Sequence, residues 1–397
     1  MVLDMIIPEI WTYVEAILSY NPVHRRKWDF SGLMHYFSCR AKESRELFKS
    51  VIPFMTRLAL ELPKVLEQPI PLLKIGENKA ITLSQRQIAS LLANAFFCTF
   101  PRRNDHRKSS EYGTFPSIHF NLLFAGVPSS GECFPAQAAK LDGLFHYFRT
   151  IMRKDPQGTV TFQRRAVPPD CLPVWNECPE LLSEMTVDAA GSIEDDGRDM
   201  LQLDFANKMI GGGVVGRGAV QEEIRFILSP ELIVSRLFVE ELQDYECVLI
   251  VGAQRYSRHQ GYSSTFEWYQ RKSVIRELNK AYGGFLPSPV SSHDVATPIA
   301  TGNWGCGAFN GDPQLKSLLQ LMAASVAKRQ LFYFTFGDYE LCSQLRAIHT
   351  GLKEQMVTVG QLYDWIRAYF TNIVRANIES NSKISTTLYD YIWSQLE

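Results

Sequence analysis

The hydrophobic pattern of this chain changes its period near residue 155, and this change limits the possible folds more than any other feature of the sequence. Before it, apolar residues such as Leu47, Val51 and Met55 recur every three or four positions, which indicates helices with one buried face. After about residue 158, short apolar runs alternate with helical patterns, which is typical of an α/β domain. We therefore expect a helical region over residues 1–155 and an α/β domain over residues 156–397.

Several helix starts are marked by capping residues. Ser84 and Gln87 form a capping-box pattern directly before an apolar stripe that begins at Ile88. The same signal recurs at Thr358 with Gln361, and an N-cap residue followed by proline stands at Ser229–Pro230 and at Asp312–Pro313. Each of these places predicts a helix that begins there.

Strand-like apolar runs occur in the second part of the chain, at Val160–Phe162, Leu201–Phe205, Val248–Val251 and Leu331–Phe336. Two of them are continuously apolar, which is typical of central strands covered on both faces. Helices that cover both faces of a sheet make three layers. We therefore predict a three-layer αβα sandwich, preceded by an all-helical region.

The composition narrows the class of protein. Lys and Arg number 41 and Asp and Glu number 42, so the formal net charge of -1 lacks the positive excess expected of a non-specific nucleic-acid binder. The basic run at residues 102–108 has no closely interleaved aromatic residues and is interpreted as a solvated loop. The eight histidines are dispersed, and the sequence holds no cluster with metal-ligand spacing.

The eight cysteines lack the paired CxxC spacing of a zinc module, and most stand inside apolar stretches. We interpret them as buried, reduced thiols. No segment reaches the roughly 18 apolar residues that a membrane-spanning helix needs. The expected location is therefore a reducing compartment, the nucleus or the cytoplasm. The cysteines are Cys39, Cys98, Cys133, Cys171, Cys178, Cys247, Cys306 and Cys342.

The most unusual segment runs from Leu201 to Phe226 and contains three successive glycines, Gly211–Gly213, followed by Gly216 and Gly218. Without Cβ atoms, the N–H groups of such a loop can approach a phosphate closely. A flexible connection is the other interpretation of a glycine run. The spacing also satisfies G-x-G-x-x-G, but no sustained helical pattern follows, so a nucleotide-dependent oxidoreductase is disfavoured.

Polar and acidic residues flank these glycines. Asp204 and Asn207 precede them, and Gln221, Glu222 and Glu223 follow them. Apolar neighbours of the acidic pair predict a strand near the core, on which adjacent side chains point to opposite faces. The two glutamates are therefore not expected to act as the opposed carboxylates of an ordinary glycosidase. Instead, one of them is expected to transfer the proton.

The pattern GGG-x7-QEE, from Gly211 to Glu223, resembles the signature of the poly(ADP-ribose) glycohydrolases. The resemblance extends over most of the chain and implies a macrodomain-like mixed sheet joined to the family's N-terminal helical accessory region. Supporting segments are LLANAFFC at Leu91–Cys98, SIEDDG at Ser192–Gly197, LDFAN at Leu203–Asn207, QRYSRHQGY at Gln254–Tyr262, TGNWGCGAFNGD at Thr301–Asp312 and FTFGD at Phe334–Asp338.

The resemblance also implies roles for individual residues. Glu223 would be the general acid and then the base, Glu222 would hold the ribose, and Asp204 would support the site. The glycine loop would wrap the diphosphate. The implied substrate-binding residues are Ile193 and Glu194 for adenine recognition, Tyr262 as a residue that closes over the ligand, Asn303, Phe309 and Phe336 on the diphosphate and adenine-stacking side, and Phe205, Asn207, Gly211, Gly212, Gly213 and Gln221 around the site.

The expected function is hydrolysis of the ribose–ribose O-glycosidic bonds of poly(ADP-ribose), mainly from the chain end, with release of ADP-ribose. A pocket that grips one terminal unit through backbone amides needs no basic groove, which agrees with the low net charge. The alternative is a non-catalytic ADP-ribose-binding macrodomain, because that fold hosts readers as well as enzymes. Glu223 behind Gln221 is the feature that binding alone would not need.

The same resemblance sets the expected partners. They are poly(ADP-ribose), ADP-ribose and poly(ADP-ribosyl)ated proteins, in the DNA damage response. We expect no metal or other cofactor, no direct nucleic-acid partner and no membrane partner. The protein is expected to be a monomer.

Overall fold

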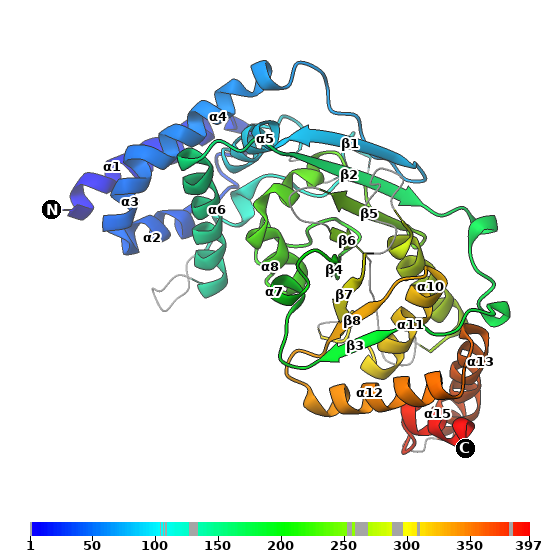
Figure 1. Cartoon of the computed structure of the whole chain (residues 1–397). Coiled ribbons are helices and arrows are strands. Elements are labelled where there is room, and N and C mark those ends of the chain that lie inside the picture. Colours follow the sequence, from blue (N-terminus) through cyan, green and yellow to red (C-terminus); the bar gives the residue numbers. More distant parts are fainter. Residues whose placement is uncertain are drawn as a thin grey trace. The chain divides into compact units, whose positions relative to one another are not determined.

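The computed structural model describes residues 2–103, 105, 107, 109–126, 134–251, 256–258, 269–287, 297–307, 310–380 and 384–397, with the backbone alone for 2–10 and 256–258. The chain forms two compact units (Figure 1). The first contains Met1–Ile75, Ala80–Thr161 and Lys208–Glu241, and the second contains Gly76–Lys79, Phe162–Asn207 and Leu242–Glu397. The glycine-rich segment therefore packs with the N-terminal helices, although it follows strands of the second unit in sequence.

The first unit is mainly helical, as the periodicity predicts. Its aromatic core centres on Phe96, whose ring lies 5.1 to 5.8 Å from those of Phe120, Phe124 and Phe145. The helices are α1 (Val2–Ser19), η1 (Pro22–His24), α2 (Ser31–Cys39), α3 (Ala41–Glu46), η2 (Leu47–Val51), α4 (Ile52–Val65), α5 (Gln85–Phe96), η3 (Phe120–Leu122), α6 (Pro135–Arg153), α8 (Gln221–Leu228) and η6 (Pro230–Leu237). A strand that the periodicity did not predict, β1 (Lys79–Ser84), leads into α5.

Three of the predicted helix starts are confirmed as capped starts. The Ser84 Oγ accepts a hydrogen bond from the Gln87 N–H at 3.1 Å, and the Gln87 side chain accepts one from the Ser84 N–H at 2.8 Å. Thr358 begins α13 in the same way, and the Asp312 carboxylate caps the start of α11. The helix predicted after Ser229–Pro230 is a 3₁₀ helix, and Ser229 makes no side-chain cap there.

The second unit is built on a mixed sheet, which confirms the predicted sheet type. Its strands lie in the order β2-β5-β6-β4-β7-β8-β3. Strands β6, β4, β7, β8 and β3 run parallel to one another, with Leu201 opposite Ile299 and Ile299 opposite Leu331, whereas β5 runs antiparallel to β6. The strands are β2 (Thr159–Ala166), β3 (Met185–Asp188), β4 (Leu201–Asp204), β5 (Glu246–Val251), β6 (Tyr256–Arg258), β7 (Ile299–Gly302) and β8 (Leu331–Phe334).

Helices pack against this sheet (Figure 1). α10 packs on β5 and on α11, α11 packs on β8, and α12 packs on β3. Buried side chains of α11, such as Leu318 and Met322, share one hydrophobic core with Leu201, Ile299 and Leu331 of the strands. The helical elements are η4 (Pro169–Cys171), η5 (Trp175–Glu177), α7 (Ile193–Asp196), α10 (Arg271–Phe285), α11 (Pro313–Val326), α12 (Tyr339–Glu354), α13 (Val359–Tyr369), η7 (Phe370–Arg375), α14 (Ala376–Glu379) and α15 (Leu388–Leu396).

The strand predicted around the acidic pair is wrong, because residues 221–228 form helix α8. Glu223 stands at the third helical position, where its side chain accepts the Val220 N–H at 2.9 Å and so satisfies a donor that a helix start leaves unpaired. Acidic residues in the first turn also interact favourably with the helix dipole. Val220 and Ile224, which suggested a buried strand, are exposed, whereas Phe226 is buried.

The strand predicted at Leu331–Phe336 is confirmed only as far as Phe334. Phe336 has φ of +52° and Gly337 has φ of +88°, and these left-handed conformations cannot continue a strand. Phe336 is 47% exposed, so its ring does not belong to the core of the sheet. Likewise, the run that starts at Leu201 ends as a strand at Asp204, one residue earlier than predicted.

The cysteines among the described residues are free thiols. Cys98, Cys178, Cys247 and Cys342 are buried as predicted, but Cys39 and Cys171 are exposed and Cys306 is partly exposed, so the interpretation of the cysteines as buried is wrong for these three. Cys133 lies outside the described residues. Within the described part of the chain, no helix combines the length and the apolar content needed to cross a membrane.

We predict that Ser84→Ala lowers the free energy of unfolding by about 1 kcal/mol, because the buried helix α5 loses its N-cap hydrogen bond. Chemical denaturation measures the change. Ser50→Ala is a matched control: the Ser50 hydroxyl donates to the Glu46 carbonyl one turn earlier in the chain and caps no helix start, so its effect should stay within about 0.5 kcal/mol. Equal effects of the two substitutions would contradict the prediction.

Candidate functional site

Two carboxylates accept hydrogen bonds from the backbone of the glycine loop, which we define as residues 209–218. Glu222 and Glu223, at the start of α8, are only 3% and 5% exposed. The Gly211 N–H donates to Glu222 Oε1 at 2.6 Å, and the Gly213 N–H donates to Glu223 Oε1 at 2.7 Å. The Val220 N–H donates to the second oxygen, Glu223 Oε2, at 2.9 Å. Backbone amides therefore hold both carboxylates in defined positions.

The glycines are required because the carboxylates approach the loop so closely. A Cβ on Gly212 would lie 2.3 Å from Glu223 Oε1 and 2.8 Å from Glu222 Oε2, and a Cβ on Gly218 would lie 2.6 Å from Glu223 Oε1. Gly211 and Gly212 also have positive φ angles of +82° and +46°. The sequence pattern predicted that a phosphate approaches these glycines. In the structure, the carboxylate oxygens of Glu222 and Glu223 occupy the space that Cβ atoms would fill.

Two buried cations contact the loop carbonyls, and sequence reasoning missed both. Lys140 Nζ donates to the carbonyl oxygens of Gly213, Val214 and Gly216 at 3.0, 3.3 and 2.9 Å. Arg236 Nη1 donates to those of Ile210 and Gly212 at 2.6 and 3.0 Å. The only sequence signal for Lys140 was a charged residue one turn before Leu144, on the predicted apolar face of its helix. No feature of the sequence pointed to Arg236.

Burial of the Lys140 side chain lowers its pKa to about 8. The nearby Glu223 carboxylate acts in the opposite direction, and the Arg236 guanidinium acts in the same direction as burial. The Lys140 amino group, which holds three carbonyl groups, therefore has a pKa well below that of an ordinary lysine.

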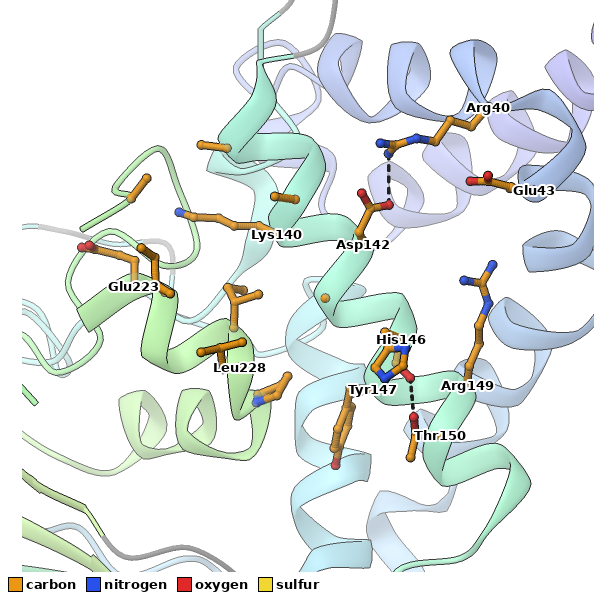
Figure 2. Close-up of a pocket in the computed structure, with 17 residues that line it drawn as sticks. Arg40, Glu43, Lys140, Asp142, His146, Tyr147, Arg149, Thr150, Glu223 and Leu228 are labelled. Carbon is orange, nitrogen blue, oxygen red and sulfur yellow. Dashed lines mark hydrogen bonds and ion pairs between the residues drawn. The ribbon is translucent and has the colours of Figure 1, made fainter. Parts of the chain in front are cut away.

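A cavity of about 1200 Å³ opens beside these residues (Figure 2). Figure 2 shows Lys140 extending from α6 toward Glu223 on α8, at one end of the cavity. At the other end lie Arg149 and Arg40, and Arg40 pairs with Asp142 at 3.0 Å. The cavity therefore has Glu223 and Lys140 at one end and charged side chains of both signs at the other.

In the second unit, the other predicted residues follow the carboxyl ends of parallel strands. Asp204 ends β4, Asn303 follows β7, Phe336 follows β8, and Glu194 follows β3 after a short turn. Carboxyl ends of parallel strands meet at one edge of a sheet, where α/β proteins bind ligands. The structure thus brings these residues to a single edge, whereas the glycine loop and both glutamates belong to the first unit.

This edge is held by its own contacts. The Tyr333 hydroxyl donates to Asn303 Oδ1 at 3.0 Å, and Asn303 Nδ2 donates to the Thr335 carbonyl at 3.4 Å. The Phe336 ring lies against Gly302, where a Cβ would be 2.5 Å from the ring. Asn303 and Phe336 therefore have defined positions on this edge.

The remaining predicted residues differ in exposure. Asp204 is buried, while Phe205, Asn207, Glu194 and Gln221 are partly exposed. The Ile193 side chain is buried against Ala300 and Phe334, so adenine recognition by Ile193 would have to use its backbone. Tyr262 and Phe309 lie outside the described residues. Among the described residues, no group of three or more His, Cys, Asp or Glu side chains is arranged to hold a metal ion.

We predict that Gly212→Ala lowers the free energy of unfolding by about 2–4 kcal/mol, because the new methyl group displaces Glu223 and the residue keeps a positive φ. Gly76→Ala is the matched control, since Gly76 has φ of +80° but its Cβ would meet no atom within 4 Å. The control should lose only about 1 kcal/mol from backbone strain. Denaturation curves that coincide for the two variants would show that the carboxylate contact is unimportant.

Two family models match most of the chain. The helical domain of poly(ADP-ribose) glycohydrolase matches residues 39–164, and its macrodomain fold matches residues 172–272 and 267–343. These matches confirm the expected combination of a helical region and a macrodomain-like sheet.

Relatives also match most of this chain. Poly(ADP-ribose) glycohydrolase 1 of Arabidopsis thaliana is 30% identical over 83% of this chain and 79% of its own length. Probable poly(ADP-ribose) glycohydrolase 2 of the same plant is 30% identical over 90% of this chain and 85% of its own length. Poly(ADP-ribose) glycohydrolase 2 of Caenorhabditis elegans is 30% identical over 94% of this chain and 82% of its own length. With the GGG-x7-QEE pattern folded into a buried carboxylate site, this chain belongs to the poly(ADP-ribose) glycohydrolase family.

Proposed function

We propose that this protein hydrolyses the ribose–ribose O-glycosidic bonds of poly(ADP-ribose), mainly from the chain end, and releases ADP-ribose. Membership of the family and the activity named for its relatives support this activity. The observation that carries the chemical assignment is the position of Glu223, whose buried carboxylate is held by two backbone N–H groups at the start of α8. A non-catalytic reader has no need of a carboxyl group held in this way.

Glu223 is the proposed acid and base. Cleavage of a glycosidic bond needs a proton on the departing oxygen and stabilisation of an oxocarbenium-like centre. Each oxygen of a carboxylate has two lone pairs, and the described bonds use one on each Glu223 oxygen. A lone pair is therefore left to carry the proton that goes to the departing ribose oxygen. The ionised group then takes a proton from the water that attacks the anomeric carbon.

Glu222 is proposed to bind the ribose rather than to transfer the proton. Its Oε1 accepts the Gly211 N–H, and its Oε2 lies 2.8 Å from the position that a Cβ on Gly212 would occupy, so the carboxylate has a set orientation. Adjacent positions on a helix point about 100° apart, which suits two different roles better than a pair of opposed catalytic groups. Asp204, the last residue of β4, and Asn207, three residues later, are proposed to support the site.

The diphosphate is proposed to lie against the glycine loop. The N–H groups of Gly211 and Gly213 already donate to glutamates, and those of Gly212 and Val214 donate to carbonyl oxygens within the loop. A diphosphate would therefore approach the bare Cα surface of the loop and use donors other than these four. In a typical phosphate-binding glycine loop, by contrast, the backbone N–H groups donate to the phosphate itself.

Phe336 is the proposed stacking partner of adenine. Its ring is half-exposed at the sheet edge and lies against Gly302. Tyr262 and Phe309 are proposed to contribute on the same ligand, and Ile193 and Glu194 to recognise adenine. Poly(ADP-ribosyl)ated proteins in the nucleus or cytoplasm are the proposed cellular substrates.

We predict that Glu223→Gln lowers kcat by about 10²–10⁴-fold, the usual contribution of a general acid–base group, or about 3–5 kcal/mol in barrier height. ADP-ribose affinity, measured by calorimetry, should change little because glutamine keeps the size of the side chain. Glu340→Gln, on the exposed start of α12, serves as the control and should keep wild-type turnover. Wild-type turnover in Glu223→Gln would remove Glu223 from the mechanism.

We predict that Phe336→Ala weakens ADP-ribose binding by about 1–3 kcal/mol through loss of base stacking. Because the ring is 47% exposed, the melting temperature should stay close to that of the wild type. Tyr339→Ala removes another exposed aromatic residue three positions later and should leave the affinity unchanged. Calorimetry with ADP-ribose and a thermal melt distinguish lost stacking from lost folding, and unchanged affinity in Phe336→Ala would disprove the stacking role.

A further inference from the structure

We propose that Arg236 and Lys140 are positioning residues, which orient the peptide groups of the glycine loop so that their N–H groups meet Glu222 and Glu223. The catalytic consequence rests on the proposed function, in which Glu223 transfers the proton. The positioning itself rests on hydrogen bonds between described residues of the first unit.

Arg236 holds the two peptide groups that contact the glutamates. The peptide between Ile210 and Gly211 offers its carbonyl to Arg236 Nη1 at 2.6 Å and its N–H to Glu222 at 2.6 Å. The peptide between Gly212 and Gly213 offers its carbonyl to the same Nη1 at 3.0 Å and its N–H to Glu223 at 2.7 Å. The carbonyl and the N–H of a trans peptide point in opposite directions. A cation that holds the carbonyl therefore directs the N–H toward the carboxylate.

Arg236 itself is held in place from several sides. Its Nε donates to the Ser117 carbonyl at 2.5 Å, and the side chain is buried. Its own carbonyl accepts a hydrogen bond from the Arg103 guanidinium at 2.9 Å. Arg103 is buried, so the interpretation of residues 102–108 as a solvated loop is wrong for this residue. Hydrogen bonds that share one peptide group polarise one another, so the cation also strengthens the N–H donor on the far side.

Lys140 holds the next part of the loop. Its three carbonyl partners, on Gly213, Val214 and Gly216, match the three N–H donors of an ammonium group. A neutral amine has two N–H donors and a lone pair, which would face a carbonyl oxygen. The charged form of Lys140 is therefore the form that holds this turn.

Lys140 makes the positioning sensitive to pH. Burial lowers its pKa to about 8, against the influence of the facing Glu223 on α8 and with that of Arg236 on η6. Activity should therefore fall as pH rises through about 8. The free energy of unfolding should not fall over the same pH range. The lysine of the unfolded chain has a pKa of about 10.4, so between about pH 8 and pH 10.4 the unfolded chain binds more protons than the folded one. In that window the contribution of Lys140 to stability rises with pH.

The first test compares Lys140→Met with the wild type, using poly(ADP-ribose) turnover against pH. We expect kcat to fall about 10- to 100-fold, as for a small misplacement of a reacting group, and the alkaline decline near pH 8 to disappear. Arg153→Met, in the exposed last turn of the same helix, is the control and should keep the wild-type rate and profile. A wild-type kcat and pH profile in Lys140→Met would overturn the role of Lys140.

Lys140→Arg covers the case in which Lys140→Met does not fold. Arginine stays charged throughout this pH range, so its alkaline decline should move above that of the wild type. An unmoved decline would also overturn the proposal.

Hydrogen exchange of the peptides that cover residues 209–218 gives a measurement that does not depend on turnover. In Arg236→Lys a point charge replaces the guanidinium fork, so exchange of the Gly211 and Gly213 amides should be faster than in the wild type at the same pH. Lys140→Met should also raise exchange in this loop. Unchanged exchange in both variants overturns the positioning, even if the wild type proves inactive. An inactive wild type whose loop exchange does respond would refute the proposed function alone.

Discussion

The hydrogen bonds from backbone amides to Glu222 and Glu223 are the interactions on which the rest of the site depends. Both carboxylates are almost fully buried, and a buried carboxylate without such donors costs several kcal/mol. The Gly211, Gly213 and Val220 N–H groups meet this need. They do so only if the loop backbone passes within hydrogen-bond distance of the start of α8, and this condition explains the glycines.

Because the loop backbone passes so close to the glutamates, buried cations are also needed on its other side. A loop that turns its N–H groups toward carboxylates turns the carbonyls of the same peptides the other way. In the first unit these carbonyls, and those of the following turn, meet Arg236 and Lys140. The charges of the two glutamates and the two cations therefore act on each other across a layer of peptide groups. No local feature of the loop sequence supplies these cations, because they come from α6 and η6.

In the second unit, the direction of the strands brings the candidate ligand-binding residues together. Parallel strands end at one edge, so residues far apart in sequence, such as Asn303 and Phe336, become neighbours there. The left-handed conformation of Phe336 ends the strand and leaves the ring exposed instead of buried in the sheet. Strand direction and one unusual backbone angle together place an aromatic surface where a ligand can reach it.

The sequence by itself determined the features that depend on neighbouring residues. The change of period predicted the helical and α/β parts, the capping patterns at Ser84 and Thr358 predicted helix starts, and the glycine and QEE spacing identified the family. It did not determine α8, because three apolar residues near the acidic pair suggested a strand, and two of them, Val220 and Ile224, are exposed. Only the tertiary structure decided that glutamate oxygens fill the space beside the glycines and that Lys140 and Arg236 stand behind them. These contacts join α6, α8 and η6, and local sequence patterns do not encode which distant side chains meet.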